Sequence, residues 1–177
     1  INENTKMIIL NYPNNPTGKI LPEKLQDSII QTAKDHDLYV LSDEIYENYT
    51  MTRTEEEWTV APRKPILQYG YGKSIITQSF SKSYAMTGYR IGYVIADPSI
   101  IDKMSKLQAL SLTNVSEPIQ YIALQALYAD TSKNTEIIKS RLEAIVKIAK
   151  DIDLEFIEPD GAMYLFAKTK YKDFDAT

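Results

Sequence analysis

Short apolar runs and one helical pattern organise the start of the chain. Residues 6–10, KMIIL, form an apolar run that is typical of a strand buried on both faces. A turn-forming stretch with two prolines and a glycine follows, and residues 21–37 show helical spacing before a second apolar run at 38–41. The apolar residues of this helix share one face: Leu25, Ile29, Ile30 and Ala33. Strand, helix and strand in this order predict a βαβ unit with parallel strands.

The middle of the chain extends this alternation. Residues 50–66 are polar and interrupted by prolines, so we expect a surface excursion there. Two more strand patterns occupy 74–80 and 90–96, and patterns typical of helices follow at 98–112 and 117–129. The chain is therefore expected to adopt an α/β fold in which a mostly parallel sheet is flanked by helices.

The pattern changes near Ser132. Residues 134–153 form one long amphipathic helix, and residues 154–168 are typical of two strands joined by a Pro-Asp-Gly turn. The apolar side of the long helix carries Ile137, Ile138, Leu142, Ile145, Val146 and Ala149. Because a helix followed by a hairpin departs from α/β alternation, we predict a large domain at 1–131 and the start of a small α+β domain at 132–177.

Three polar stretches lie at or just after the carboxyl ends of predicted strands of the sheet. They occupy residues 11–18, 43–46 and 79–82. In α/β sheets, ligands gather beyond the carboxyl ends of the parallel strands. If the three strands are neighbours, these stretches converge on one crevice, which is where we expect the chemistry of the protein.

Lys82 follows an apolar strand and stands between two serines, which favours a partly enclosed position over that of an ordinary solvated lysine. A lysine amine in such a place can form a Schiff base with a carbonyl compound. Ser79, Ser81 and Arg90 add hydroxyl donors and a planar cation, a combination suited to a phosphate dianion. Together these residues predict a pocket for a phosphorylated aldehyde.

Asp43, Tyr46 and Asn15 have both a structural and a functional interpretation. Asp43 either has a structural role, in which it caps the next helix or faces water, or holds a pyridine nitrogen protonated, which makes the ring an electron sink. Tyr46 is either ordinary packing or a donor to a ring hydroxyl on the same side. Asn15 is either a turn residue or an amide donor to the same oxygen.

Composition narrows the range of functions. The 177 residues are 44% apolar and 25% charged, as in globular proteins, and a net charge of −4 gives no general attraction to nucleic acid or to an anionic membrane. The chain has no cysteine and a single histidine, His36, which argues against disulfides and against a metal site. No apolar run reaches the roughly 18 residues that span a bilayer, and no signal peptide opens the chain, so we expect a cytoplasmic protein.

Three segments, in this order and spacing, resemble a known family. NYPNNPTG, SDEIY and SFSKSYAMTGYRIGY are similar to the signature segments of class I/II aminotransferases, the aspartate aminotransferase family of fold-type I pyridoxal-phosphate enzymes. The resemblance runs from Met7 to Phe166, because PDGAMYLF is similar to the small-domain hairpin of that family. It implies an enzyme that uses pyridoxal 5′-phosphate to move an amino group between an amino acid and a 2-oxo acid, and a homodimeric parent protein.

The resemblance also implies a role for each candidate residue around the cofactor ring. Lys82 matches the lysine that forms the internal aldimine and moves a proton between the substrate and the cofactor. Asp43 matches the carboxylate that pairs with the pyridine nitrogen. Tyr46 and Asn15 match the two donors to the phenolic oxygen of the ring.

The resemblance divides the phosphate site between this chain and its missing flanks. Ser79 and Arg90 match phosphate ligands of the family, and Ser81 is a further candidate. The family also has a glycine-rich phosphate loop, an aromatic residue that stacks on the ring and an arginine that binds the substrate carboxylate, none of which has a counterpart here. Arg141, on the predicted long helix, does not match that arginine. We therefore expect the chain to be the central part of a protein about twice as long.

Two other interpretations stay open at this point. A C–S β-lyase of the same fold would use the same cofactor-binding residues, because the choice of reaction depends on how the substrate is oriented. A non-catalytic fragment or interaction domain would explain why parts of the expected site are missing. The sequence leaves the identity of the amino acid substrate undecided.

Overall fold

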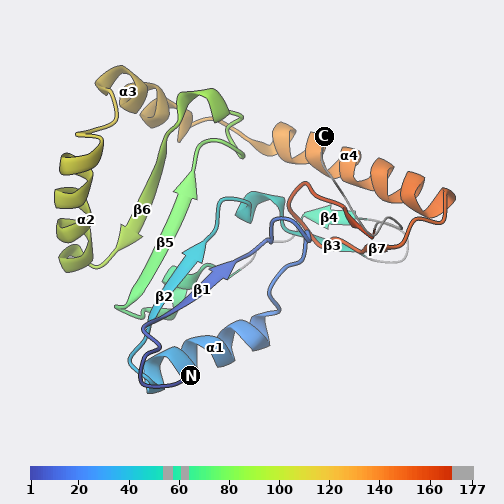
Figure 1. Cartoon of the computed structure of the whole chain (residues 1–177). Coiled ribbons are helices and arrows are strands. Elements are labelled where there is room, and N and C mark those ends of the chain that lie inside the picture. Colours follow the sequence, from blue (N-terminus) through green and yellow to red (C-terminus); the bar gives the residue numbers. More distant parts are fainter. Residues whose placement is uncertain (54–57, 61–63, 169–177) are drawn as a thin grey trace, which may run out of the picture.

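The computed structural model describes residues 1–53, 58–60 and 64–168 and has a four-stranded sheet at its centre (Figure 1). The strands lie in the order β1 (Met7–Asn11), β2 (Tyr39–Asp43), β5 (Ser74–Ser79) and β6 (Gly92–Ala96). β1, β2 and β5 run parallel, whereas β6 is antiparallel to β5. The predicted α/β fold with a mostly parallel sheet is confirmed.

The register aligns the carboxyl ends of the three parallel strands. Asn11 of β1 lies opposite Asp43 of β2, and Asp43 lies opposite Thr77 of β5. Because parallel strands end at the same edge of a sheet, the polar stretches that follow them begin side by side. The predicted convergence of these stretches is confirmed at the level of the backbone.

One face of β1 and β2 is covered by α1 (Glu23–Asp35). The buried residues of this helix are Gln26, Ile30 and Ala33. Leu25, which the pattern placed on this face, is 51% exposed instead. Gln26 takes the buried position because its Nε2 atom donates a hydrogen bond to the Lys64 carbonyl (2.8 Å), and a satisfied amide is tolerated in a core.

β1 is buried on one face only, so the prediction of a strand buried on both faces is wrong. Leu10 is buried, and Ile8 packs against the same core cluster. Ile9, which points to the opposite face, is 67% exposed. Successive side chains of a strand alternate between faces, and within the described residues the second face of β1 stays uncovered.

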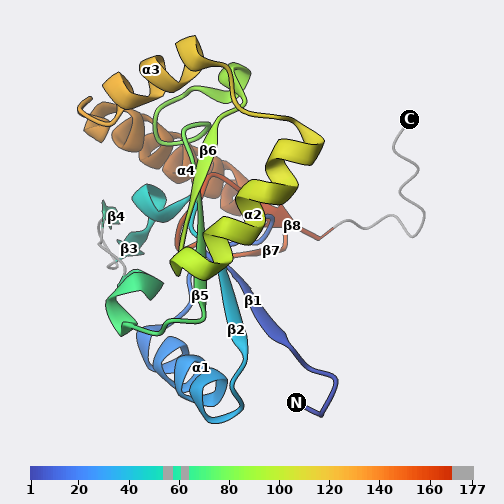
Figure 2. The same ribbon diagram turned by 90° about the vertical axis from the view of Figure 1, so that its left-hand side faces the viewer.

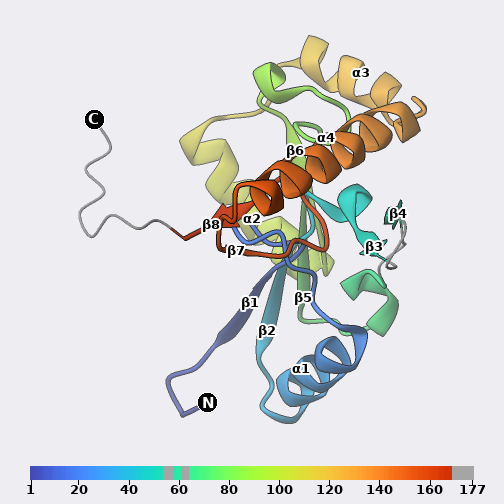
Figure 3. The same ribbon diagram turned by 90° about the vertical axis from the view of Figure 1, so that its right-hand side faces the viewer.

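The helices of the second half are α2 (Pro98–Ser111), α3 (Glu117–Ala126) and α4 (Ser132–Asp151). α2 contacts β6 and is seen in front of the sheet in Figure 2. Figures 1 and 3 show α3 and α4 at the end of the sheet toward which β1, β2 and β5 point. All three predicted helices are confirmed, with ends shifted by a few residues. None of the described helices combines the length and the apolar character that a membrane crossing needs.

Residues 50–66 contain two short strands that the pattern did not predict. β3 (Met51–Arg53) pairs with β4 (Trp58–Val60) in an antiparallel sheet. Met51 is buried in a cluster with Leu142 of α4. The expectation of a surface segment is therefore wrong at Met51, because this residue completes a core that the sequence alone did not reveal.

The Pro-Asp-Gly segment does not form the predicted tight turn. β7 (Phe156–Ile157) and β8 (Phe166–Ala167) are antiparallel, but each has only two residues, and a longer loop joins them. Within this loop, the Asp160 N–H donates to the Gly18 carbonyl (2.8 Å), and the Met51 N–H donates to the Asp160 carbonyl (2.9 Å). The segment bends at Asp160 without closing a tight hairpin, because its backbone groups pair with distant parts of the chain.

The predicted boundary near Ser132 stays a prediction. α4 shares one buried cluster with the residues that follow β2, through Leu142 and Val146 on one side and Tyr46 and Tyr49 on the other. The last part of the predicted small domain, residues 169–177, lies outside the described residues.

Candidate functional site

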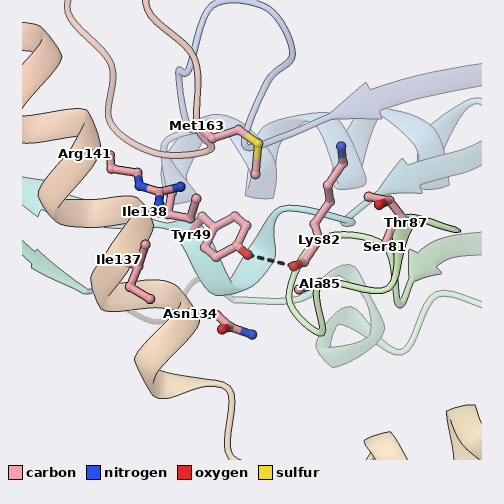
Figure 4. Close-up of a pocket in the computed structure, with 10 residues that line it drawn as sticks. All are labelled: Tyr49, Ser81, Lys82, Ala85, Thr87, Asn134, Ile137, Ile138, Arg141 and Met163. Carbon is pink, nitrogen blue, oxygen red and sulfur yellow. Dashed lines mark hydrogen bonds between the residues drawn. The ribbon is translucent and has the colours of Figure 1, made fainter.

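Lys82 lies in the loop that follows β5, at the carboxyl edge of the sheet (Figure 4). The loop turns back on itself, because the Ala85 N–H donates to the Lys82 carbonyl (3.0 Å). Phe80 and Ser83 are buried, which anchors the loop on both sides of the lysine. The Lys82 side chain is half-buried, and its amine makes no hydrogen bond or ion pair with the described residues. The amine is thus held near the sheet and left available to a ligand.

Asp43 is the last residue of β2 and is half-buried. Its Oδ1 atom accepts a hydrogen bond from Thr77 Oγ1 on the neighbouring strand (3.1 Å). On the other side, Asn11 occupies the matching position of β1, and its buried Oδ1 atom has no hydrogen-bond partner within the described residues. A carboxylate oriented by Thr77 and an unsatisfied amide oxygen therefore stand at adjacent strand ends.

Tyr46 is 2% exposed and contacts both Lys82 and Tyr164. The Lys82 Nζ atom is 5.6 Å from the centroid of the Tyr46 ring. The Tyr46 and Tyr164 hydroxyls share a hydrogen bond, and their rings meet edge to face with centroids 5.5 Å apart. The structure thus brings Tyr46 and Lys82 together and adds Tyr164, which the sequence did not suggest.

The buried Tyr46 hydroxyl makes stability depend on pH. Burial, the hydrogen bond with Tyr164 and the nearby Asp43 carboxylate all raise the pKa of Tyr46 above its ordinary value of 10.0. The folded state therefore keeps the proton more tightly than the unfolded state, so this contribution to stability is full below pH 10.0 and is lost as the pH rises above that value.

We expect the free energy of unfolding to fall more steeply above pH 10.0 in the unmodified chain than in Tyr46→Phe, by up to about 1 kcal/mol per pH unit. Urea unfolding between about pH 8 and about pH 11 measures this difference. Tyr128→Phe is the matched control, because the Tyr128 ring is exposed. Equal slopes for Tyr46→Phe and the unmodified chain would contradict the prediction.

The candidate phosphate ligands lie where β5 ends and β6 begins. Ser79 Oγ accepts a hydrogen bond from the Ser81 N–H (3.0 Å) and donates one to the Ile91 carbonyl (3.4 Å). Arg90 is exposed, and its Nη1 atom donates to the Thr87 carbonyl (3.1 Å). The structure brings Ser79 and Ser81 into contact and leaves most of the Arg90 guanidinium open to solvent, so their role as phosphate ligands stays a prediction.

Asn15 lies in the turn after β1, next to Asn14, whose side chain makes the hydrogen bonds that stabilise the turn. Asn14 Nδ2 donates to the Asn11 carbonyl (3.2 Å), and Asn14 Oδ1 accepts from the N–H and the hydroxyl of Thr17. Gly18 closes the turn with a hydrogen bond to the Asn14 carbonyl (2.8 Å). Because Asn14 satisfies the turn, the exposed Asn15 amide has no partner within the described part of the chain and can serve a ligand.

A cavity of about 390 Å³ lies between the Lys82 loop and α4 (Figure 4). Its lining residues are Tyr49, Ser81, Lys82, Ala85, Thr87, Asn134, Ile137, Ile138, Arg141 and Met163. The four residues from α4 recur at i, i+3, i+4 and i+7, the spacing of one helix face. Helical spacing is therefore the sequence signal that places Asn134 and Arg141 on this face, although the predicted stripe of apolar residues did not include these two polar side chains.

Comparison with known proteins shows which family the sequence of this chain matches. The sequence model of the family described as aminotransferase class I and II matches residues 1–174. The aspartate aminotransferase of Pyrococcus horikoshii is 37% identical over 172 residues, which cover 94% of this chain and 42% of that protein. The asparagine–oxo-acid transaminase of Streptococcus mutans is 35% identical over 173 residues, with 94% and 42% covered.

A solved structure of an aminotransferase has the same fold as this chain. The crystal structure of the Thermotoga maritima aspartate aminotransferase superposes with a TM-score of 0.81 at 32% identity, covering 96% of this chain and 44% of that one. The chain thus spans less than half the length of the relatives it matches. Its sequence and its fold agree: this chain belongs to the class I and II aminotransferase family.

Proposed function

We propose that this chain forms the lysine-bearing part of an aminotransferase that moves an amino group between an amino acid and a 2-oxo acid with pyridoxal 5′-phosphate. One observation carries the proposal. The Lys82 amine lies 5.6 Å from the centroid of the Tyr46 ring, at the carboxyl ends of the parallel strands. Asp43, the last residue of β2, precedes Tyr46 by three residues in the sequence. Membership of the aminotransferase family supports the choice of reaction.

The residues at this edge fit a phosphorylated pyridine ring. The Asp43 carboxylate receives a hydrogen bond from Thr77 at one oxygen and keeps the other for a protonated ring nitrogen. The buried Asn11 Oδ1 atom, which lacks a partner within the described residues, is a second acceptor at the same level of the sheet. Acceptors at strand ends, with Asn15 and Tyr46 as donors, match the polar atoms of such a ring.

Each residue would make a separate contribution. When bound, pyridoxal phosphate supplies an aldehyde and an electron-accepting ring. Lys82 would hold the aldehyde and carry a proton to and from the substrate α-carbon through its amine. Asp43 would keep the ring nitrogen protonated, and Ser79 with Arg90 would bind the phosphate dianion.

An assay of the two competing reactions tests this proposal. The full-length protein, loaded with pyridoxal phosphate, is incubated with L-aspartate or L-asparagine and 2-oxoglutarate, because relatives are named for these amino donors. We expect the amino group to appear on the 2-oxo acid. Release of pyruvate and ammonia from a cysteine conjugate, without amino-group transfer, would overturn the proposal in favour of a β-lyase.

The phosphate role of Arg90 predicts a ligand-specific defect. Arg90→Gln should weaken binding of pyridoxal phosphate by about 10- to 100-fold, the range expected for one hydrogen bond to a charged group. Binding of pyridoxal, which lacks the phosphate, should be unchanged. Fluorescence titration with each ligand measures the two affinities, and an equal loss for both ligands would contradict a phosphate role.

A cytoplasmic location and a homodimeric state of the full-length protein are part of the same proposal. Large apolar side chains on and after α3 are exposed in the described chain: Tyr121, Ile122, Leu124, Leu127 and Tyr128. An exposed apolar surface of this kind favours association with another subunit. Sedimentation analysis that gives a monomer mass would contradict the homodimer.

A further inference from the structure

The backbone that follows Lys82 is held by two side chains from separate parts of the chain. Tyr49 Oη donates a hydrogen bond to the Lys82 carbonyl (2.8 Å), as the dashed line in Figure 4 marks. Asn134 Nδ2 donates to the next carbonyl, that of Ser83 (3.0 Å). Two successive peptide groups beside the lysine are thus fixed by residues 33 and 51 positions away along the chain.

Tyr49 is itself firmly placed. It belongs to η1 (Glu47–Tyr49), the short helix that follows the Asp43–Tyr46 stretch, and it is 2% exposed. Its ring packs with Leu142 and Val146 of α4, and its own carbonyl accepts from the Ala162 N–H (2.9 Å). Burial raises the pKa of Tyr49, so its hydroxyl keeps the proton that it donates. A rigid donor therefore meets the lysine loop from the core.

The Lys82 carbonyl receives a second hydrogen bond, from the Ala85 N–H (3.0 Å). A carbonyl oxygen has two lone pairs, so Tyr49 and Ala85 together saturate it and fix the direction in which it points. The lysine side chain is long and flexible, with four rotatable bonds. Fixing the backbone of Lys82 fixes the point from which this side chain extends. The position of the Lys82 amine relative to Asp43 and Tyr46 depends on this starting point.

Asn134 connects the same loop to α4. It lies in the first turn of that helix, is half-buried, and lines the cavity that Lys82 and Tyr49 also line. Ser83, whose carbonyl it binds, is buried. α4 therefore contacts the lysine loop through a directed hydrogen bond and not by packing alone.

We propose that Tyr49 and Asn134 are positioning residues for Lys82, which hold the two peptide groups after it and so aim its amine at the carboxyl edge of the sheet. This inference rests on the proposed role of Lys82. A purely structural role for Tyr49 would stabilise the core without affecting the loop, and the two roles differ in what they predict for a variant that keeps the ring.

Tyr49→Phe keeps the buried ring and removes only the hydroxyl. Tyr71→Phe is the matched control, because Tyr71 Oη donates to the Leu38 carbonyl (2.7 Å) near the opposite end of β2. Asn134→Ala tests the second contact, and Asn114→Ala, which loses a hydrogen bond to the Val115 carbonyl (3.0 Å), is its control.

The first measurement is amide hydrogen exchange of Ala85 in the full chain, free of cofactor. A typical net hydrogen-bond contribution corresponds to a factor of about 2 to 10 in an equilibrium, so we expect exchange to be faster by that factor in Tyr49→Phe and in Asn134→Ala. Tyr71→Phe and Asn114→Ala should leave it unchanged. Unchanged exchange in both test variants would overturn the inference.

The second measurement is the rate at which Lys82 is modified by pyridoxal phosphate and borohydride. The lysine amine adds to the aldehyde, water leaves, and hydride from borohydride reduces the resulting C=N bond to a stable amine that mass spectrometry locates. We expect the rate at Lys82 to fall by about 2- to 10-fold in Tyr49→Phe, with rates at exposed lysines unchanged. Equal rates in Tyr49→Phe and the unmodified chain would overturn the inference.

The two measurements separate failure of this inference from failure of the proposed function. If Lys82 of the unmodified protein does not react at all, the proposed function fails, and the exchange of Ala85 still decides whether Tyr49 and Asn134 hold the loop. If Lys82 reacts normally in every variant and exchange is unchanged, the proposed function survives and the positioning role is wrong.

Discussion

Replacing Lys82 with alanine is expected to abolish covalent attachment of pyridoxal phosphate and the visible absorbance that accompanies it. The amine of Lys82 makes no hydrogen bond or ion pair with the described residues and lies 5.6 Å from the Tyr46 ring centroid. The loop between β5 and β6 contains no other lysine that could replace it. Amino-group transfer should fall by about 10²- to 10⁴-fold or more, because the proton carrier is also lost. Absorbance titration and a transamination assay measure the two effects.

Lys106→Ala is the control for this substitution. Lys106 lies exposed on α2, away from the sheet edge, and its removal should change neither the spectrum nor the rate. An unchanged absorbance in Lys82→Ala would contradict the proposed function. Stoichiometric cofactor uptake with turnover by the 177-residue chain alone would exclude the interpretation of the chain as a non-catalytic interaction domain.

Replacing Gly18 with alanine is expected to lower the free energy of unfolding by about 2–5 kcal/mol. Gly18 has φ +70°, a left-handed conformation that costs a residue with a Cβ atom about 1–2 kcal/mol. The added Cβ would also lie 2.7 Å from Pro159 Cβ and 2.9 Å from the Tyr164 carbonyl. Overpacking of this kind adds about 1–3 kcal/mol. Urea unfolding measures the loss.

Gly70→Ala separates the two causes. Gly70 has φ +57°, but no atom lies within 4 Å of the Cβ that alanine would add. It should therefore show only the backbone cost, about 1–2 kcal/mol. Equal losses at Gly18 and Gly70 would contradict the claim that close contact with the Pro159–Tyr164 loop determines the effect.

The sequence was sufficient to predict the helices, the strands of the sheet and the positions of candidate residues at strand ends, because these features depend on residues close together in the chain. Helices and strands of the sheet follow from the spacing of apolar residues, and each was found near its predicted place. The position of Lys82 after a strand, and of Asp43 at the end of another, follows from the same local pattern. Because ligand sites of α/β sheets lie at these ends, the candidate site could be located before any contact was known.

Contacts across long chain separations could not be predicted. Local turn chemistry favoured a hairpin at Pro-Asp-Gly, but that segment forms hydrogen bonds with Gly18 and Met51 instead of closing on itself. Helical spacing put Leu25 in the core, but a hydrogen bond to Lys64 allowed Gln26 to be buried there instead. In both cases a distant backbone group satisfied polar atoms that a local pattern treats as solvent-facing.

The sequence by itself determined the family and the fold class and predicted the residues that could meet a cofactor, since these depend on residue types at short spacing. Only the tertiary structure decided which side chains surround them. Tyr46 meets Tyr164 across 118 residues, and Tyr49 and Asn134 reach the Lys82 loop from separate elements. Such pairs carry no periodic signal in the chain, because their distance is set by how the elements pack and not by the spacing of residues within one of them.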